Sequence, residues 1–150
     1  MKRYYPFGDF FIKETKIANS FLSKYSSNEK VHIGSWEVSI TYSNEEFFIK
    51  HSFGDKEIYF NTLVGIARFD FKRYGLWEWI AALKINWPTA ITDTLVGSDD
   101  DGKEYLGQLI NSSSKCLEEN LGRIVSAKKP IIKLMDEARE TTLKEWYKKR

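Results

Sequence analysis

The sequence predicts an α+β fold, because the spacing of its apolar residues changes twice along the chain. Apolar residues recur at helical spacing over residues 10–25, alternate with polar residues in short segments between 36 and 72, and return to helical spacing after Gly75. We therefore expect an N-terminal helix, a four-stranded antiparallel meander and a C-terminal segment of three to four helices. A chain of 150 residues is long enough for one such unit, so residues 1–150 are expected to form a single globular domain.

The first helix is predicted to start at Asp9, whose carboxylate can accept hydrogen bonds from the free N–H groups of the first turn. The helix is expected to stop at the run Ser26-Ser27-Asn28, which breaks the apolar spacing. Its apolar stripe consists of Phe10, Phe11, Ile17, Ala18, Phe21, Leu22 and Tyr25.

The meander is predicted from strict alternation, with strands over residues 36–42, 47–53, 58–62 and 66–72. A turn over residues 43–46 sets Val38 opposite His51, and a two-residue turn at 54–55 sets His51 opposite Ile58. Both turns place the same apolar set on one face of the sheet. A slip of one residue in either hairpin would destroy that agreement, so the assignment of faces is well determined.

The rest of the chain is predicted to be helical, in segments 76–87, 88–95, 101–124 and 130–146. Pro88 ends the first of these segments and can open the second. Asp101 with Glu104 three residues later is the pattern of a capping box at the start of the third. Pro130 opens the last.

Composition excludes several classes of protein. The hydrophobic fraction of 42% is too high for intrinsic disorder, and a single cysteine, Cys116, allows no intrachain disulfide. A net charge of +2 favours neither nucleic acid nor an acidic substrate. The N-terminus lacks the apolar core of a secretory signal, and no apolar run is long enough to span a membrane. We therefore expect a cytoplasmic protein with no membrane association.

Metal binding and cofactors are not expected. The run Asp99-Asp100-Asp101-Gly102 resembles part of a calcium loop, but Gly97 and Gln108 occupy the positions of the first carboxylate and the final glutamate. Helix capping is the expected role of these aspartates. The histidines and the cysteine do not stand at the spacing of a zinc site.

No catalytic constellation is visible either. The sequence contains no nucleophile elbow, phosphate-binding glycine loop or metalloprotease motif. His51 falls on the inner face of the sheet, where a hydrogen-bonded core histidine is the expected role rather than a general base. Cys116 lies beside the apolar stripe of a helix, so we expect a buried, inert thiol. A small enzyme whose groups meet only in the fold stays a third possibility.

Two groups of residues are candidates for binding a partner protein. The first is on the outer sheet face, where the predicted register puts Phe48 beside Lys50 and sets Lys50 opposite Tyr59. Coverage of this face by another helix is the alternative. The second group combines an aromatic ring with an acidic segment that would attract a basic partner. It comprises Trp77, Asp99, Asp100 and Asp101. Ordinary solvated loops are the alternative interpretation of this group.

A third group of residues suggests nucleic-acid binding. Lys72, Arg73 and Tyr74 interleave cationic and aromatic side chains, as a platform for stacked bases does. The basic C-terminal helix could follow phosphates, although a solvated helix face accounts for its charges equally simply. These residues define the alternative function, that of a nucleic-acid-associated accessory protein.

In size, charge and organisation over the whole chain, this aromatic-rich α+β domain resembles the bacterial toxin-immunity proteins. The resemblance implies a cytosolic protein that neutralises a partner toxin by stoichiometric binding and has no enzymatic activity of its own. It also implies that the acidic segment would face a basic toxin domain. The oligomeric state is not indicated by the sequence.

Overall fold

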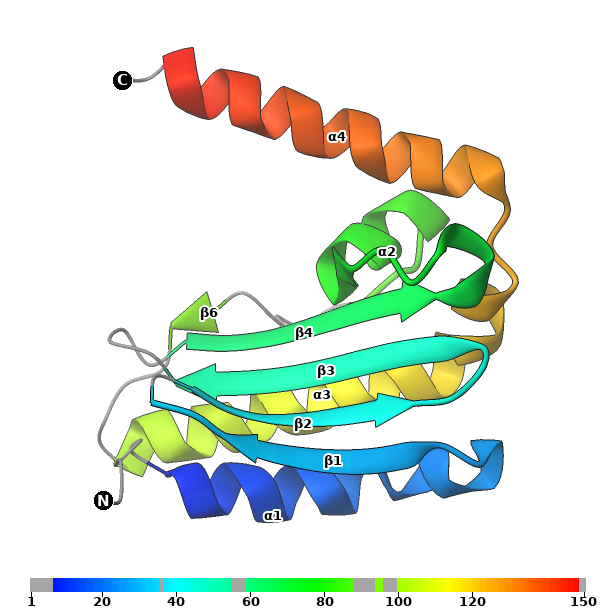
Figure 1. The fold of residues 1–150 in the computed structure, drawn as a ribbon. Helices are drawn as coiled ribbons and strands as arrows, with labels where there is room; N and C mark the ends of the chain where they lie inside the picture. The colour runs from blue at the N-terminus through cyan, green and yellow to red at the C-terminus, as the bar shows by residue number, and fades with distance from the viewer. Residues whose placement is uncertain (1–6, 36, 55–58, 88–93, 96–99, 149–150) are drawn as a thin grey trace.

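The computed structural model describes residues 7–35, 37–54, 59–87, 94–95 and 100–148 (Figure 1). Its fold is α+β, as predicted. The helices are α1 (Gly8–Ala18), η1 (Ser20–Tyr25), η2 (Ala67–Phe69), α2 (Leu76–Leu83), α3 (Asp100–Val125) and α4 (Lys129–Lys148). The strands are β1 (Asn28–Ile33), β2 (Glu37–Ser43), β3 (Phe47–Gly54), β4 (Tyr59–Ile66), β5 (Tyr74–Gly75) and β6 (Thr94–Leu95).

The strands form one antiparallel sheet in the order β1-β2-β3-β4-β5, and the short β6 pairs with β4. The edge strand β1 was not predicted. All six of its residues are exposed, so its sequence lacks the alternation that marks a half-buried strand. The sheet therefore extends one strand further on the N-terminal side than the alternation indicated.

The predicted hairpin registers are wrong by an even number of residues. Val38 pairs with Phe53 instead of His51, and His51 pairs with Thr62 instead of Ile58. The second hairpin closes at Gly54 and Tyr59 through a longer loop than the predicted two-residue turn. Because side chains alternate with a period of two, these shifts leave the described residues of the two hairpins on their predicted faces.

The predicted strand over residues 66–72 is wrong. The chain leaves the sheet at Ile66, forms η2, and passes through left-handed conformations at Asp70 and Phe71, with φ of 55° and 58°. Gly65 permits this fold, because a Cβ on it would lie 2.5 Å from the carbonyl oxygen of Phe71. The N–H of Phe71 donates to the carbonyl of Ile66 at 2.9 Å and closes the turn.

The helices depart from the prediction mainly at their ends. The first begins at Gly8, after a left-handed Phe7, so the predicted cap at Asp9 is wrong and Asp9 lies inside the first turn. It stops at Asn19 rather than running to residue 25. α2 ends at Leu83, four residues early. Most of the predicted helix 88–95 is outside the described residues, but its last two residues form β6, not a helix. α3 and α4 match the predicted segments closely.

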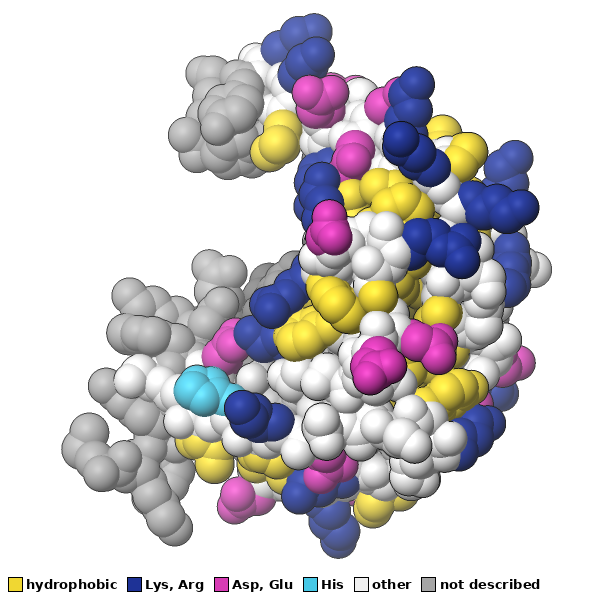
Figure 2. Space-filling view, turned by 45° about the vertical axis from the view of Figure 1, so that its right-hand side comes forward, with side chains coloured by type: hydrophobic (Ala, Val, Ile, Leu, Met, Phe, Trp, Pro, Cys, Tyr) yellow, Lys and Arg dark blue, Asp and Glu magenta, His cyan; other side chains and the backbone are white. Residues whose placement is uncertain are grey.

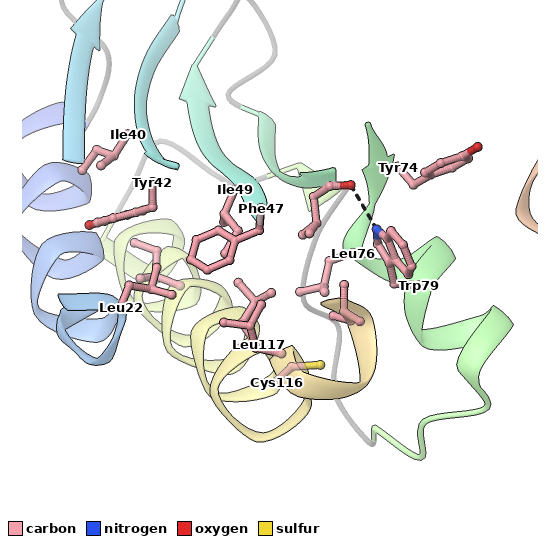
Figure 3. Packing of buried hydrophobic residues seen from close by; sticks show 14 of the residues in the cluster. Leu22, Ile40, Tyr42, Phe47, Ile49, Tyr74, Leu76, Trp79, Cys116 and Leu117 are labelled. Carbon is pink, nitrogen blue, oxygen red and sulfur yellow. Dashed lines mark hydrogen bonds between the residues drawn. The ribbon is translucent and has the colours of Figure 1, made fainter. Parts of the chain in front are cut away.

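The hydrophobic core fills the space between the sheet and the helices α1 and α3 (Figures 1 and 3). Inner-face side chains such as Ile40 and Phe47 meet Leu22 from η1 and Leu117 from α3, and all four are at most 1% exposed. In Figure 3 the indole of Trp79 extends the core toward α2, where its Nε1 donates to the carbonyl of Val64 at 3.0 Å.

A buried polar cluster links this core to α1 and α3. The ring of His51 contacts Thr62 Oγ1 through Nδ1 at 2.9 Å and Asn19 Oδ1 through Nε2 at 3.1 Å. Asn19 Nδ2 in turn donates to Ser114 Oγ at 2.9 Å. His51 is 1% exposed, so the prediction of a hydrogen-bonded core histidine is confirmed. The predicted burial of Cys116 is confirmed as well.

Candidate protein-docking surface

In Figure 1 none of the described helices crosses β1, β2 or β3 on the face of the sheet turned away from α1 and α3, and side chains there such as Lys50 and Phe48 are partly exposed. We call this face the outer face. Residues paired across antiparallel strands share a face. The register therefore places one row of side chains across it, consisting of Lys30, Thr41, Lys50, Leu63 and Gly75.

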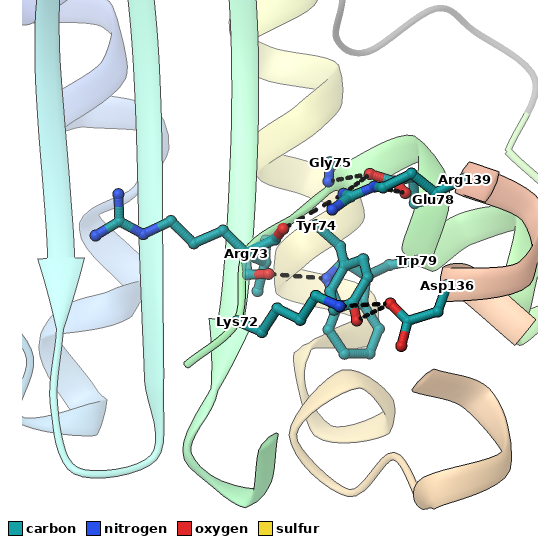
Figure 4. A network of polar contacts seen from close by, with 9 residues as sticks. Lys72, Arg73, Tyr74, Gly75, Glu78, Trp79, Asp136 and Arg139 are labelled. Atoms are coloured by element: carbon teal, nitrogen blue, oxygen red, sulfur yellow. Dashed lines mark hydrogen bonds and ion pairs between the residues drawn. The ribbon is translucent and has the colours of Figure 1, made fainter. Parts of the chain in front are cut away.

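A cation and an aromatic ring meet on the outer face beside this row. The guanidinium carbon of Arg73 lies 4.0 Å from the centroid of the Phe48 ring. Phe48 pairs with Gly65, which has no side chain, so Arg73 can reach across β4 to the ring. Figure 4 shows Arg73 extending over the neighbouring strands, away from the other polar groups of its segment. Such a contact is worth about 0.5–1 kcal/mol at an exposed site.

Lys50 also lies on this face, but in a different pairing from the predicted one. It stands between Thr41 and Leu63, and its Nζ forms an ion pair with Glu37 at 2.9 Å. Lys50 is therefore not opposite Tyr59, because the register differs by four residues. The side chain of Tyr59 is outside the described residues, so its predicted role stays a prediction.

Trp77 occupies the far end of the same row. A Cβ on Gly75 would lie 2.9 Å from Trp77 Nε1, so the indole stands directly above the place that Gly75 leaves empty. Gly75 pairs with Leu63 and shares its face. Trp77 is 46% exposed. The fold thus brings Phe48, Arg73 and Trp77 to one side of the sheet, although they come from three separate elements.

A polar network anchors α4 next to this surface (Figure 4). Glu78, only 9% exposed, accepts the N–H of Gly75 at 2.9 Å and binds both Nε and Nη2 of Arg139 from α4. A second link joins Lys72 Nζ to Asp136 at 2.7 Å. The hydrogen bonds from Lys72 and then Tyr74 hold the pKa of Asp136 below its ordinary value.

Beyond this anchor α4 has no further support among the described residues. Every described side chain from Glu140 to Lys148 is exposed, including Leu143 at 51%. Figure 2 shows the consequence, a hollow between the end of α4 and the body of the molecule. We call residues 140–148 the projecting half of α4. The outer face and the projecting half of α4 therefore form two walls of one concave surface.

The structure separates the three residues of the predicted nucleic-acid platform. Tyr74 is fully buried, and its hydroxyl donates to Asp136. Lys72 is paired with the same carboxylate. Only Arg73 turns to the outer face, so Tyr74 presents no ring on which a base could stack in this arrangement.

The acidic segment lies away from Trp77. Asp100 and Asp101 are exposed in the first turn of α3, and Asp99 is outside the described residues. The last residue of α2, Leu83, lies beside the far end of α3, where Nη2 of Arg123 donates to its carbonyl. At 1.5 Å per residue Arg123 is about 35 Å from Asp100, the first residue of α3. The predicted combination of acidic segment and tryptophan is therefore not brought together.

The cation–π contact between Arg73 and Phe48 was not predicted, because the two residues are far apart in the sequence. The only signal in the sequence was the aromatic ring of Phe48, which the predicted register placed on the outer face.

Within the described part of the chain, no group of three histidine, cysteine or acidic residues is arranged to hold a metal ion. Among the helices described, none combines the length and apolar character of a membrane span. Comparisons of the chain with family models, curated proteins and solved structures found no match.

Proposed function

We propose that this chain is a non-catalytic protein-binding module, a cytosolic immunity protein that neutralises a partner toxin by stoichiometric binding. The observation that carries the proposal is the open outer face with Phe48, Arg73 and Trp77 on it. Arginine and aromatic side chains are the residues that most often dominate the free energy of protein–protein association.

The size of the surface supports a role for both walls in the proposed binding. Strands β1 to β4, spaced about 4.8 Å apart and about seven residues long, give the outer face an area of roughly 400 Å². A stable protein–protein interface buries about 800 Å² on each partner. The projecting half of α4 would supply part of the difference, so we propose that the partner enters the hollow between them.

The charge of this surface determines which partner region it suits. Lys30, Lys50 and Arg73 outnumber Glu37 on the outer face, so a partner surface with carboxylates complements it. The exposed Asp100 and Asp101 would then form a separate contact with a basic part of a toxin, as the resemblance implies.

The test uses a candidate toxin chosen from the genes that neighbour the gene for this chain. We expect co-expression to protect cells from the toxin, and calorimetry to give a one-to-one complex. Arg73→Glu should weaken the complex at least tenfold, because it reverses a charge and removes the contact with Phe48. Lys115→Glu makes the same charge change at an exposed position on α3 and should have little effect. If the toxin neither binds nor is neutralised, the proposal is wrong.

Nucleic-acid binding is the second candidate, and the outer face favours it through Phe48 and the surrounding cations. In this version the platform is Phe48 with Arg73 and Lys50, not Tyr74. Titration with single- and double-stranded oligonucleotides distinguishes the two candidates, because phosphate neutralisation makes affinity fall steeply with salt. An absence of binding at low salt would eliminate this candidate.

A further inference from the structure

A separate pocket lies at the end of the sheet where β1 begins and β2 turns into β3. Its volume is about 730 Å³, and its walls come from three segments, the turn before β1, the turn between β2 and β3, and the turn after η2. Tyr25 and Phe71 supply aromatic walls, and Glu45 and Glu46 supply carboxylates. The pocket takes no part in the function proposed above.

The aromatic walls are held in place by the fold. The ring of Tyr25 packs edge-on against the buried ring of Phe47, with 6.0 Å between the centroids. Phe71 is 39% exposed. Its backbone is left-handed, a conformation that costs a residue other than glycine of order 1–3 kcal/mol, so the surrounding fold must hold it there. The close packing of its carbonyl on Gly65 maintains this turn.

The electrostatics of the pocket favour a cation. Among the described residues Glu45 and Glu46 enter no ion pair, and both side chains are exposed. The face of the Tyr25 ring already attracts a cation, since Lys24 Nζ lies 5.3 Å from its centroid. Phe71 also lines the pocket and is 39% exposed, so its ring is accessible as a second aromatic surface for a cation.

We propose that this pocket binds a basic side chain, an arginine or lysine, presented by a partner polypeptide. The aliphatic stem and charged head of such a side chain match a pocket that combines aromatic walls with carboxylates at its rim. The cation would lie against Phe71 and be neutralised by Glu45 and Glu46. The proposal stands on the pocket alone, and its failure would leave the function proposed for the outer face unaffected.

The test uses the full chain and a short peptide with one central arginine, compared with the same peptide carrying neutral citrulline. Backbone amide shifts in NMR spectra report the site of binding and the dissociation constant. We expect the arginine peptide to shift amides of residues 25–28, 43–46 and 71, and the citrulline peptide to bind more weakly.

Variants identify the groups responsible. Phe71→Gly removes the ring and suits the left-handed backbone, so it should fold normally and weaken binding about two- to fivefold. Glu45→Gln with Glu46→Gln should weaken it about fivefold or more. Glu118→Gln with Glu119→Gln changes the net charge equally on α3 and should leave binding unchanged. Shifts outside the pocket, equal binding of citrulline, or equal losses in the two charge variants would overturn the proposal.

Discussion

Acid should destabilise this protein through His51 over a defined pH range. Complete burial lowers the pKa of His51 from its ordinary value of 6.5 to about 3 in the folded chain. The unfolded chain binds a proton at this side chain below pH 6.5, whereas the folded chain does not. The free energy of unfolding therefore falls by about 1.4 kcal/mol per pH unit between these values, up to about 5 kcal/mol in all.

The assay is urea unfolding at a series of pH values for the wild-type chain and for His51→Gln. Glutamine keeps a donor and an acceptor but does not titrate, so its free energy of unfolding should fall less steeply as the pH drops from 6.5 toward 3. His32→Gln is the matched control, because it makes the same substitution at an exposed position on β1, away from the buried polar cluster of His51. Equal slopes for the wild type and His51→Gln would refute the reasoning.

Three further predictions concern single sites in the fold. Gly65→Ala should lower the free energy of unfolding by about 1–3 kcal/mol, because the new Cβ would lie 2.5 Å from the carbonyl oxygen of Phe71. Urea unfolding measures this, and an unchanged urea midpoint would contradict it. Arg139→Met should speed hydrogen exchange across α4, because it removes the anchor between Arg139 and Glu78. It should also lower the free energy of unfolding by about 1–3 kcal/mol, since the nearly buried carboxylate of Glu78 loses its cationic partner. Unchanged exchange would show that Arg139 does not hold α4. Burial raises the pKa of the Cys116 thiol to about 11. A thiol reagent at mildly alkaline pH should therefore react with Cys116 only as fast as the chain opens. Rapid labelling of the folded chain would count against this.

The side-chain period of the strands explains why the faces of the sheet could be predicted while the pairings could not. Val38 and His51 lie on the predicted inner face although each has a different partner from the one expected. A shift by two or four residues changes which side chains touch but not which side they occupy. Loop lengths determine the pairing, and the hairpin closed at Gly54 did not use the shortest turn available.

The turn after β4 shows where local pattern was misleading. Ala67, Phe69 and Phe71 alternate with charged residues as a strand would, yet the chain folds back over Gly65. A hydrophobic pattern reports the period of burial. It does not report whether a neighbouring glycine leaves room for another segment of backbone.

The sequence by itself determined the α+β class, the inner face of the meander, the two long C-terminal helices and the burial of His51, because these follow from periodicity within short windows. The docking surface depended on tertiary structure. Phe48 is on the outer face in both the predicted and the observed register. The approach of Arg73 to its ring and the position of Trp77 over Gly75, however, require β5 to return beside β4. Such contacts join residues distant in the chain, and their geometry depends on the whole sheet having formed.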